Sequence, residues 1–397
     1  MKNSTKFIRC SFLLAAAVTA FNIMPSSADA QRPSLQELLD RTAELEEKLA
    51  NVSVVEGELQ GLAGPHLIIE GANLHVRNET GCSFNDDARG NLILGWNEQS
   101  DGETEFRIGS HCLVMGPEHS WTQELNIVAG VNHNVTDFCN LVVGEDHTVS
   151  ANECAVFGEG NTASNVRAFV SGHDNTASGA ESFVAGGEGN TASGLDSFIG
   201  GGFENTASGQ SSFVGAGSLN EASGSESFAS GQQNVVSGIR SVAFGFNNTS
   251  SGFDSFAAGS ADNIASGSSS FVAGGNGSTA SAFAATSLGN SNTASGMFSF
   301  VGGGNNNTAN GESSFIAAGQ GNDTQGLWSF AAGRNNTVLA TADDSFVTGN
   351  NNSTGGTQSF IGGGFSNVNI GARTGTVGGQ NNTNNDFLGF IGGGDGS

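Results

Sequence analysis

The sequence predicts an all-β fold, a parallel β-solenoid or β-roll of about twenty coils of 14–15 residues, preceded by a short N-terminal coiled-coil helix. Two observations predict it: the composition and a pair of residue ladders. The chain has 61 Gly among 397 residues, yet it also carries 28 Phe. Disordered Gly-rich segments lack aromatic residues because they cannot bury them. Regularly placed Phe in such a chain therefore indicates a repeat fold.

The first ladder is mainly phenylalanine. It runs from Leu113 to Phe390 in steps of 14 or 15, with two steps of 16 that we place at Phe346 and Thr376. Its most regular stretch contains Phe183, Phe198, Phe213 and Phe228. Adjacent residues of a strand point to opposite sides, so Phe and the following small residue cannot both face inward. We expect the small Val and Ala side to face the interior and the Phe row to face another subunit.

The second ladder is asparagine. It runs from Asn161 to Asn382, is broken only by Ser278, and includes Asn175, Asn190, Asn205 and Asn220. Asn is favoured at turns because its amide bonds nearby backbone. We interpret the row as a structural ladder at a corner of each coil rather than a row of ligand-binding amides.

Each coil is predicted to hold two short strands, for example 190–194 and 197–201, joined by turns of Gly and polar residues. Stacked parallel strands lie about 4.8 Å apart, so twenty coils make a rod of roughly 95 Å. One coil cannot bury its own apolar side, and stacking supplies the core. The roll is expected over 111–397.

The first thirty residues are predicted to be a signal peptide. A basic head is followed by an apolar run at 12–21 and by Ala28-Asp29-Ala30, the small-x-small pattern of a cleavage site. We expect an exported protein, extracellular or at the cell surface, with no integral membrane segment in the mature chain. The net charge of −25 repels nucleic acid, so no nucleic-acid partner is expected.

A short helix or coiled coil is predicted over 31–56. Ser34 and Glu37 form a capping box, and apolar residues from Leu35 to Val52 follow heptad spacing. We favour a clasp that joins a homotrimer over an amphipathic helix lying on the body. A β-rich cap region is expected over 57–110, with strands at 66–70, 73–76 and 91–95.

Four cysteines follow the signal segment, namely Cys82, Cys112, Cys139 and Cys154. An even number in an exported chain favours disulfides over metal ligands. Cys139 and Cys154 are one coil apart, so we predict that they are bonded, which leaves Cys82 with Cys112.

No catalytic constellation stands out in the sequence. His133 and His147 are 14 residues apart and are expected to stack on adjacent coils, where we favour surface-exposed polar side chains over a metal row. The Gly-rich strings lack the helix that a dinucleotide loop needs. We therefore predict that the protein is not an enzyme, with no catalytic residues, no metal site and no cofactor.

Units of Asn-Thr-Ala-Ser-Gly at 175–179, 190–194 and 205–209 are each followed by Ser-Phe-[Val/Ile]-x-Gly. These units resemble the head repeats of trimeric autotransporter adhesins of the YadA-like type. The resemblance implies a left-handed parallel β-roll, trimerisation and binding to host matrix or other surfaces. Two features depart from that family: the heptads precede the roll, and its C-terminal membrane anchor is missing.

Three functions follow from these observations. The first is a secreted or cell-surface adhesive rod that binds a surface, matrix or glycan ligand. The second is a carbohydrate-directed fibre. The third is an ice- or mineral-binding solenoid, indicated by a Thr after each Asn at Thr162, Thr176, Thr191 and Thr206. We rank it last because that row is interrupted by Glu221, Val235 and Ile264.

Overall fold

The structure is a computed structural model that describes residues 33–57, 59, 62–77, 88–96, 98 and 106–396. The predicted signal peptide and Cys82 lie outside these residues. The chain divides into two compact units, Met1–Val76 and Arg77–Ser397. The predicted cap region, 57–110, is thus shared between the two units.

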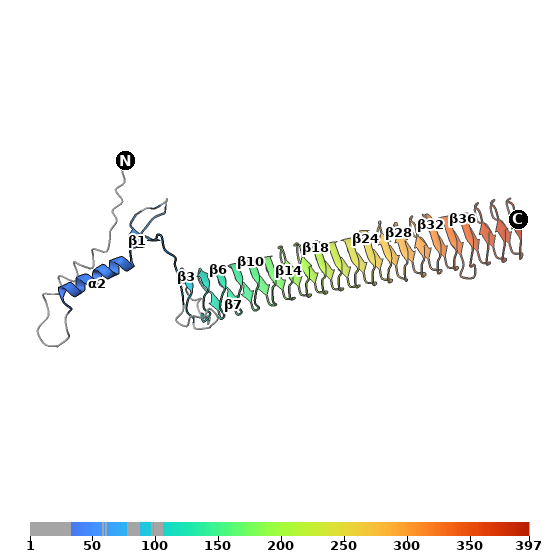
Figure 1. The fold of residues 1–397 in the computed structure, drawn as a ribbon. Helices are drawn as coiled ribbons and strands as arrows, with labels where there is room; N and C mark the ends of the chain where they lie inside the picture. The colour runs from blue at the N-terminus through green and yellow to red at the C-terminus, as the bar shows by residue number, and fades with distance from the viewer. Residues whose placement is uncertain are drawn as a thin grey trace, which may run out of the picture. The chain divides into compact units, whose positions relative to one another are not determined.

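The first unit contains helix α2 (Leu35–Lys48) and the antiparallel strands β1 (Val52–Val55) and β2 (His66–Ile69) (Figure 1). The helix begins as predicted, with the Glu37 N–H donating to Ser34 Oγ at 3.1 Å. No residue of α2 is buried. Val52, expected to continue the heptads, lies in β1, and the strand expected at 73–76 does not form. No helix among the described residues is long and apolar enough to cross a membrane.

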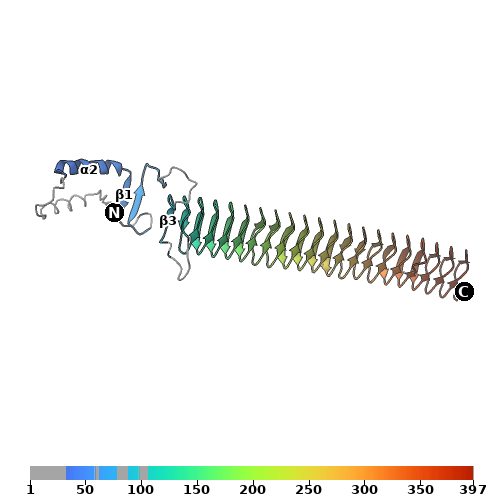
Figure 2. The same ribbon diagram turned by 90° about the horizontal axis from the view of Figure 1, so that it is seen from below.

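The second unit is a rod of stacked coils built from two parallel sheets (Figures 1 and 2). This confirms the predicted all-β parallel solenoid. One sheet carries the Phe ladder and is called the phenylalanine sheet. Its strands are β3 (Leu92–Leu94), β4 (Leu113–Met115), β6 (Ile127–Val131), β8 (Leu141–Glu145), β10 (Ala155–Glu159), β12 (Phe169–His173), β14 (Phe183–Val184), β16 (Phe198–Ile199), β18 (Phe213–Ser218), β20 (Phe228–Gln232), β22 (Val242–Phe246), β24 (Phe256–Ala261), β26 (Phe271–Ala273), β28 (Thr286–Leu288), β30 (Phe300–Val301), β32 (Phe315–Gln320), β34 (Phe330–Arg334), β36 (Phe346–Asn350), β38 (Phe360–Ile361), β40 (Gly375–Thr376) and β42 (Phe390–Ile391).

The other sheet carries the residue that follows each ladder Asn and is called the threonine sheet. Its strands are two residues long because each is bounded by a turn after the next Ser. They are β5 (Ser120–Trp121), β7 (Asn134–Val135), β9 (Thr148–Val149), β11 (Thr162–Ala163), β13 (Thr176–Ala177), β15 (Thr191–Ala192), β17 (Thr206–Ala207), β19 (Glu221–Ala222), β21 (Val235–Val236), β23 (Thr249–Ser250), β25 (Ile264–Ala265), β27 (Thr279–Ala280), β29 (Thr293–Ala294), β31 (Thr308–Ala309), β33 (Asp323–Thr324), β35 (Thr337–Val338), β37 (Ser353–Thr354), β39 (Val368–Asn369) and β41 (Thr383–Asn384).

Each strand pairs in parallel with the equivalent strand of the next coil. Phe183 pairs with Phe198 in one sheet, and the predicted ladder is confirmed along the rod. The 16-residue step to Phe346 is also confirmed. The step to Thr376 is wrong, because Phe360 pairs with Gly375 and Thr376 points inward and is fully buried.

The core is a thin layer of small residues between the two sheets. Val184 and Ala192 are fully buried, whereas Phe183 and Thr191 lie on the outside of their strands and are half-buried. Alternation along the strand places one residue of each pair inward. The expectation that the small side faces the interior is confirmed, and the Phe row and the Thr row occupy opposite outer faces of the roll.

The buried Asn row holds neighbouring coils together. The backbone N–H of Asn220 donates to Asn205 Oδ1 at 3.0 Å, and Asn205 Nδ2 donates to the carbonyls of Gly201 at 3.1 Å and Gly217 at 2.9 Å. One side chain therefore satisfies buried backbone groups on three successive coils, which a chain with so short strands needs. This confirms the structural ladder.

Glycine is required at the corner before each ladder Asn. Gly217 has φ +119°, a conformation that L side chains rarely adopt, and a Cβ there would overlap the carbonyl oxygen of Gly231 on the next coil. The same close approach repeats at Gly231 against Gly245. The high glycine content thus follows from how closely the coils stack.

Candidate functional site

The outer side of the threonine sheet presents hydroxyl groups in two columns. In a typical coil Asn190 and Ala192 are buried, Thr191 is half-buried and Ser193 is exposed. The four residues alternate in direction, so Thr and Ser share the outer face. We call this surface between Thr148 and Ser295 the hydroxyl face.

The serine column of the hydroxyl face is unbroken over eleven coils, and most of its members are exposed. The threonine column beside it has three interruptions, at Glu221, Val235 and Ile264. The serine column consists of Ser150, Ser164, Ser178, Ser193, Ser208, Ser223, Ser237, Ser251, Ser266, Ser281 and Ser295. The threonine column consists of Thr148, Thr162, Thr176, Thr191, Thr206, Thr249, Thr279 and Thr293.

The sequence prediction considered the threonine column alone and missed the serine column. The signal was present, since Ser223, Ser237 and Ser266 stand two residues after the three interruptions. Side chains two residues apart in a strand lie on one face. The interruptions therefore reduce the hydroxyl face to one column locally but do not divide it.

The spacing of the hydroxyl face is set by backbone geometry. Parallel strands lie about 4.8 Å apart along the rod, and residues i and i+2 are roughly 6.6 Å apart along a strand. The Thr and Ser side chains thus form a two-dimensional grid with one repeat in each direction. Thr is β-branched and restricted at χ1, so its hydroxyl loses little freedom when it binds.

The serine hydroxyls of this face are turned to solvent. Among the described residues, no side-chain hydroxyl from Ser150 to Ser281 in this column bonds to a protein acceptor, while Ser295 Oγ donates to Asn310 Oδ1. Glu221 is the one charged residue in the two columns between Thr148 and Ser295, a stretch the structure describes throughout. The face is therefore neutral and able to hydrogen-bond water at regular points.

Charges gather instead at the corners of the coils. Arg240 Nε donates to Asp254 Oδ1 at 2.7 Å, and Arg167 pairs with Glu181 on the same corner further along the rod. The guanidinium groups hold the pKa values of Asp254 and Glu181 below their usual range. All four side chains are well exposed, so these pairs add little stability.

The outer face of the phenylalanine sheet carries stacked rings. Phe183 and Phe198 have ring centroids 5.1 Å apart with planes 8° from parallel. Stacked rings cover each other's faces and leave their edges to solvent. The flat aromatic platform on which a sugar ring packs is therefore absent from this stack, which weighs against the carbohydrate-directed fibre.

Three histidines extend the Asn ladder toward the N-terminus. His119, His133 and His147 are buried, with ring centroids 4.9 Å apart, so the predicted stacking of His133 on His147 is confirmed. The prediction that they are surface-exposed is wrong. The rings face inward because they occupy the same coil position as Asn161.

The ring nitrogens of these histidines are engaged by the backbone. His133 Nε2 lies 3.1 Å from the Ala129 carbonyl, and His133 Nδ1 accepts from the His147 N–H at 3.3 Å. Burial lowers the pKa of His133 to about 4. Neither nitrogen has a free lone pair, and no group of three metal-ligating side chains forms among the described residues.

The predicted Cys139–Cys154 disulfide does not form in the structure, where both residues are free. Cys139 lies on an exposed corner with φ +58°, whereas Cys154 is buried and its Sγ contacts the Asn165 carbonyl at 3.2 Å. The sequence spacing placed them on neighbouring coils, but they point to opposite sides. Cys112 is also free, and its proposed partner Cys82 is outside the described residues.

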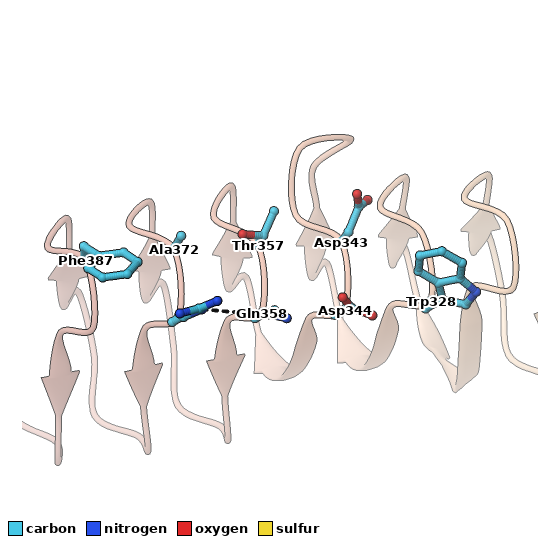
Figure 3. Close-up of a pocket in the computed structure, with 8 residues that line it drawn as sticks. Trp328, Asp343, Asp344, Thr357, Gln358, Ala372 and Phe387 are labelled. Atoms are coloured by element: carbon cyan, nitrogen blue, oxygen red, sulfur yellow. Dashed lines mark hydrogen bonds between the residues drawn. The ribbon is translucent and has the colours of Figure 1, made fainter.

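The most hollowed part of the rod is an open depression of about 430 Å³ near its C-terminal end (Figure 3). Its lining includes Trp328, Asp343, Asp344, Gln358 and Arg373. The two carboxylates point in different directions, and Arg373 Nε donates to Gln358 Oε1 at 2.9 Å. The depression brings together no nucleophile and base.

The fold and the hydroxyl face define a parallel β-roll repeat protein with one outer sheet of regularly spaced hydroxyls. The family model of a grass antifreeze beta roll matches residues 177–275, about a quarter of the chain. The match falls within the stretch covered by the serine column. No curated protein matches the chain.

Proposed function

We propose that the protein binds ice through the hydroxyl face. The observation that carries the proposal is the unbroken serine column beside the threonine column on one flat sheet. The similarity of residues 177–275 to a grass antifreeze beta roll supports it, because the matched segment runs from Ala177 to Gly275 and spans seven of the column's serines.

The physical basis is summation over a rigid grid. A hydroxyl–water hydrogen bond contributes only about 1 kcal/mol net. Many such bonds made in register to one lattice add up, provided that the side chains are already ordered. The two-sheet roll fixes the positions, and the lack of charge between Thr148 and Ser295 apart from Glu221 keeps the face compatible with an uncharged lattice. This function is non-enzymatic and fits an exported, extracellular protein.

A second candidate is the adhesive rod of YadA-like type. The observation that favours it is helix α2, whose Leu35 is 66% exposed and Leu45 54% exposed. Exposed leucines at heptad spacing suit the predicted homotrimeric clasp. In this candidate the rod presents a repeated surface to matrix or glycan, and ice has no special role.

The test measures thermal hysteresis and inhibition of ice recrystallisation on the full chain. Thr176→Lys, Thr191→Lys and Thr206→Lys together place three bulky charges on the hydroxyl face. Gln210→Lys, Gln232→Lys and Gln320→Lys add the same charge at exposed positions outside it. We expect at least a tenfold loss of activity in the first variant and full activity in the second.

Two outcomes would contradict the proposal. One is a folded full chain with no effect on ice growth. The other is equal activity in the two lysine variants, which would remove the hydroxyl face from the mechanism. Binding of the full chain to immobilised matrix proteins or glycans above freezing would instead favour the adhesive rod.

A further inference from the structure

The outer face of the phenylalanine sheet keeps one large apolar residue in every coil, at either of two positions. Most coils have Phe at the ladder position and a small residue two positions later. Four coils reverse this order: Ala155 is followed by Phe157, Val242 by Phe244, Thr286 by Leu288 and Gly375 by Val377. We call this row, from Phe157 to Phe360, the phenyl stripe.

The exchange has a steric cause. The rings lean over the residue two positions later, so that a Cβ added at Gly302 would lie 2.9 Å from Phe300 Cε1. A Cβ at Gly362 would lie 2.9 Å from Phe360 Cε1. The two positions thus share one apolar volume. Phe244 fills it from the second position and still stacks on Phe228, with centroids 5.0 Å apart.

The result is a nearly continuous apolar ridge. Nine rings are in contact from Phe157 to Phe271, and five more from Phe300 to Phe360, with Leu288 between the two runs. No charged residue occupies either position along this described stretch. The many acidic residues of the rod lie on its corners and edges instead.

The ridge exposes enough apolar surface for a stable interface. Phe271 is 40% exposed, Phe315 38% and Phe346 37%. At roughly 60 Å² of exposed surface a ring, fourteen rings present on the order of 800 Å². That equals the area each partner buries in a standard protein–protein interface, about 800 Å².

We propose that the phenyl stripe is a self-association surface, on which a second copy of this chain packs face to face along the rod. A straight apolar ridge is covered along its length only by a partner with the same axial repeat, about 4.8 Å for parallel strands. Another copy has that repeat throughout. The same patch meets itself in such a dimer, as in the commonest symmetric assemblies.

The exchange of ring positions argues against stacking within one rod as the sole reason for the stripe. Val377 follows Gly375 after the last contacting ring, Phe360, and Leu288 follows Thr286, yet neither aliphatic side chain extends a ring stack. Both keep apolar volume on the outer face. Continuity of apolar volume, rather than of ring contacts, is what a partner lying along the rod requires.

Face-to-face packing leaves the threonine sheets on the outside. The two sheets of each roll enclose its core, so the hydroxyl faces of the two copies point in opposite directions. The dimer would present two such faces. Self-association itself does not depend on whether those faces bind ice.

The test is sedimentation velocity of the full chain at micromolar concentration. Phe271→Lys, Phe315→Lys and Phe346→Lys together charge the stripe. The matched control is Phe203→Lys, Phe283→Lys and Phe298→Lys, at positions off the stripe that are 43%, 46% and 50% exposed. We expect dimers for the wild type and the control, and monomers with an unchanged β spectrum for the stripe variant.

A second pair of variants keeps the test decisive if the lysine variant fails to fold. Phe213→Val opens the stripe, and adding Gly215→Phe restores it in the pattern of Val242 and Phe244. We expect the single change to weaken the dimer at least tenfold and the double change to recover it. A monomeric wild type, or a stripe variant that dimerises as tightly as the control, would overturn the proposal.

Discussion

The Nδ1 atom of His147 accepts a hydrogen bond from the backbone N–H of Asn161 at 3.1 Å, and one coil further on Asn161 Oδ1 accepts from the Asn175 N–H at 2.8 Å. The other atoms correspond as well. His147 Nε2 lies 3.1 Å from the Val143 carbonyl, as Asn161 Nδ2 lies 2.8 Å from the Phe157 carbonyl. Neutral imidazole therefore replaces the amide as both acceptor and donor.

This equivalence predicts acid sensitivity confined to the N-terminal coils. A proton on Nδ1 of His133 would remove the acceptor for the His147 N–H, and burial already lowers the pKa of His133 to about 4 from 6.5. The unfolded chain takes up the proton first, so stability is full near pH 7. It should fall by on the order of 3 kcal/mol as the pH drops from about 6.5 to about 4. Thermal unfolding across this range measures it.

The matched control is His133→Asn with His147→Asn, which restores the residue used along the rest of the ladder. We expect the double variant to lose most of the pH dependence between 6.5 and 4, although carboxylates still titrate below it. An identical pH profile in wild type and variant would show that the imidazoles are not the titrating groups.

A second prediction concerns the amide ladder. Asn205→Ala leaves the Asn220 N–H and the Gly201 and Gly217 carbonyls without their buried partner. Each unsatisfied buried group costs about 1–3 kcal/mol, so the loss should exceed about 3 kcal/mol. Chemical denaturation measures the change.

The chain supplies its own comparison for that variant. Ser278 takes the ladder position in one coil, where its Oγ donates to the Gly289 carbonyl at 3.0 Å and accepts from the Asn292 N–H at 3.3 Å. Ser278→Asn should stabilise the protein by about 1 kcal/mol through additional bonds. If Asn205→Ala and Asn205→Ser were equally mild, the ladder would not be holding the coils together.

A third prediction tests the hydroxyl face by gain rather than loss. Glu221→Thr, Val235→Thr and Ile264→Thr together complete the threonine column between Thr148 and Thr293. These side chains point outward, so folding should be unaffected. We expect thermal hysteresis to rise at least twofold. A decrease, with the fold intact, would place the active surface elsewhere.

A fourth prediction concerns coil number. Deleting Asn190 to Leu219 removes two whole coils and brings Asn220 to the place of Asn190, so the ladder register is kept. Each coil contacts only its neighbours, and a shorter folded rod should result. Ice activity should fall in steps as more coils are removed. Deleting Ser197 to Glu204 joins unlike half-coils and should cause aggregation, as judged by light scattering.

A fifth prediction concerns thiol chemistry. Burial raises the pKa of the Cys112 and Cys154 thiols, and Cys139 is exposed on a corner. Thiolate is the reactive form, so iodoacetamide should modify Cys139 well before the other two in the native protein. Peptide mass spectrometry resolves the three sites. Finding Cys139 bonded to Cys154 would require the coils between them to differ from this structure.

The repeat itself was predictable because stacking forces every coil to place equivalent residues at equivalent points. Phe183 and Asn190 could be assigned to their ladders from spacing alone. The residue facing inward at Val184 followed from strand alternation and from the narrowness of the coil. The register near Thr376 was mispredicted because apolar spacing alone cannot say which of two adjacent residues, Gly375 or Thr376, is the outer one.

The candidate site was less predictable, since it depends on side-chain direction within each coil. His133 looked like a surface residue because its chemistry differs from that of Asn, and its equivalence emerges only from the bonds of both ring nitrogens. Cys139 and Cys154 had suitable spacing, but one residue of offset turned them to opposite sides. The serine column needed alternation to be applied one step beyond Ala192.

The ladder bond from one coil to the next has a genetic consequence. Asn205 offers the following coil the same acceptor that Asn190 offers to Asn205. A coil is a whole number of codons, and neighbouring coils are encoded by similar stretches of DNA. Unequal exchange between two such stretches therefore adds or removes complete coils while preserving both the reading frame and the hydrogen-bond register. Rod length can vary by recombination alone, without passing through an unfolded intermediate sequence.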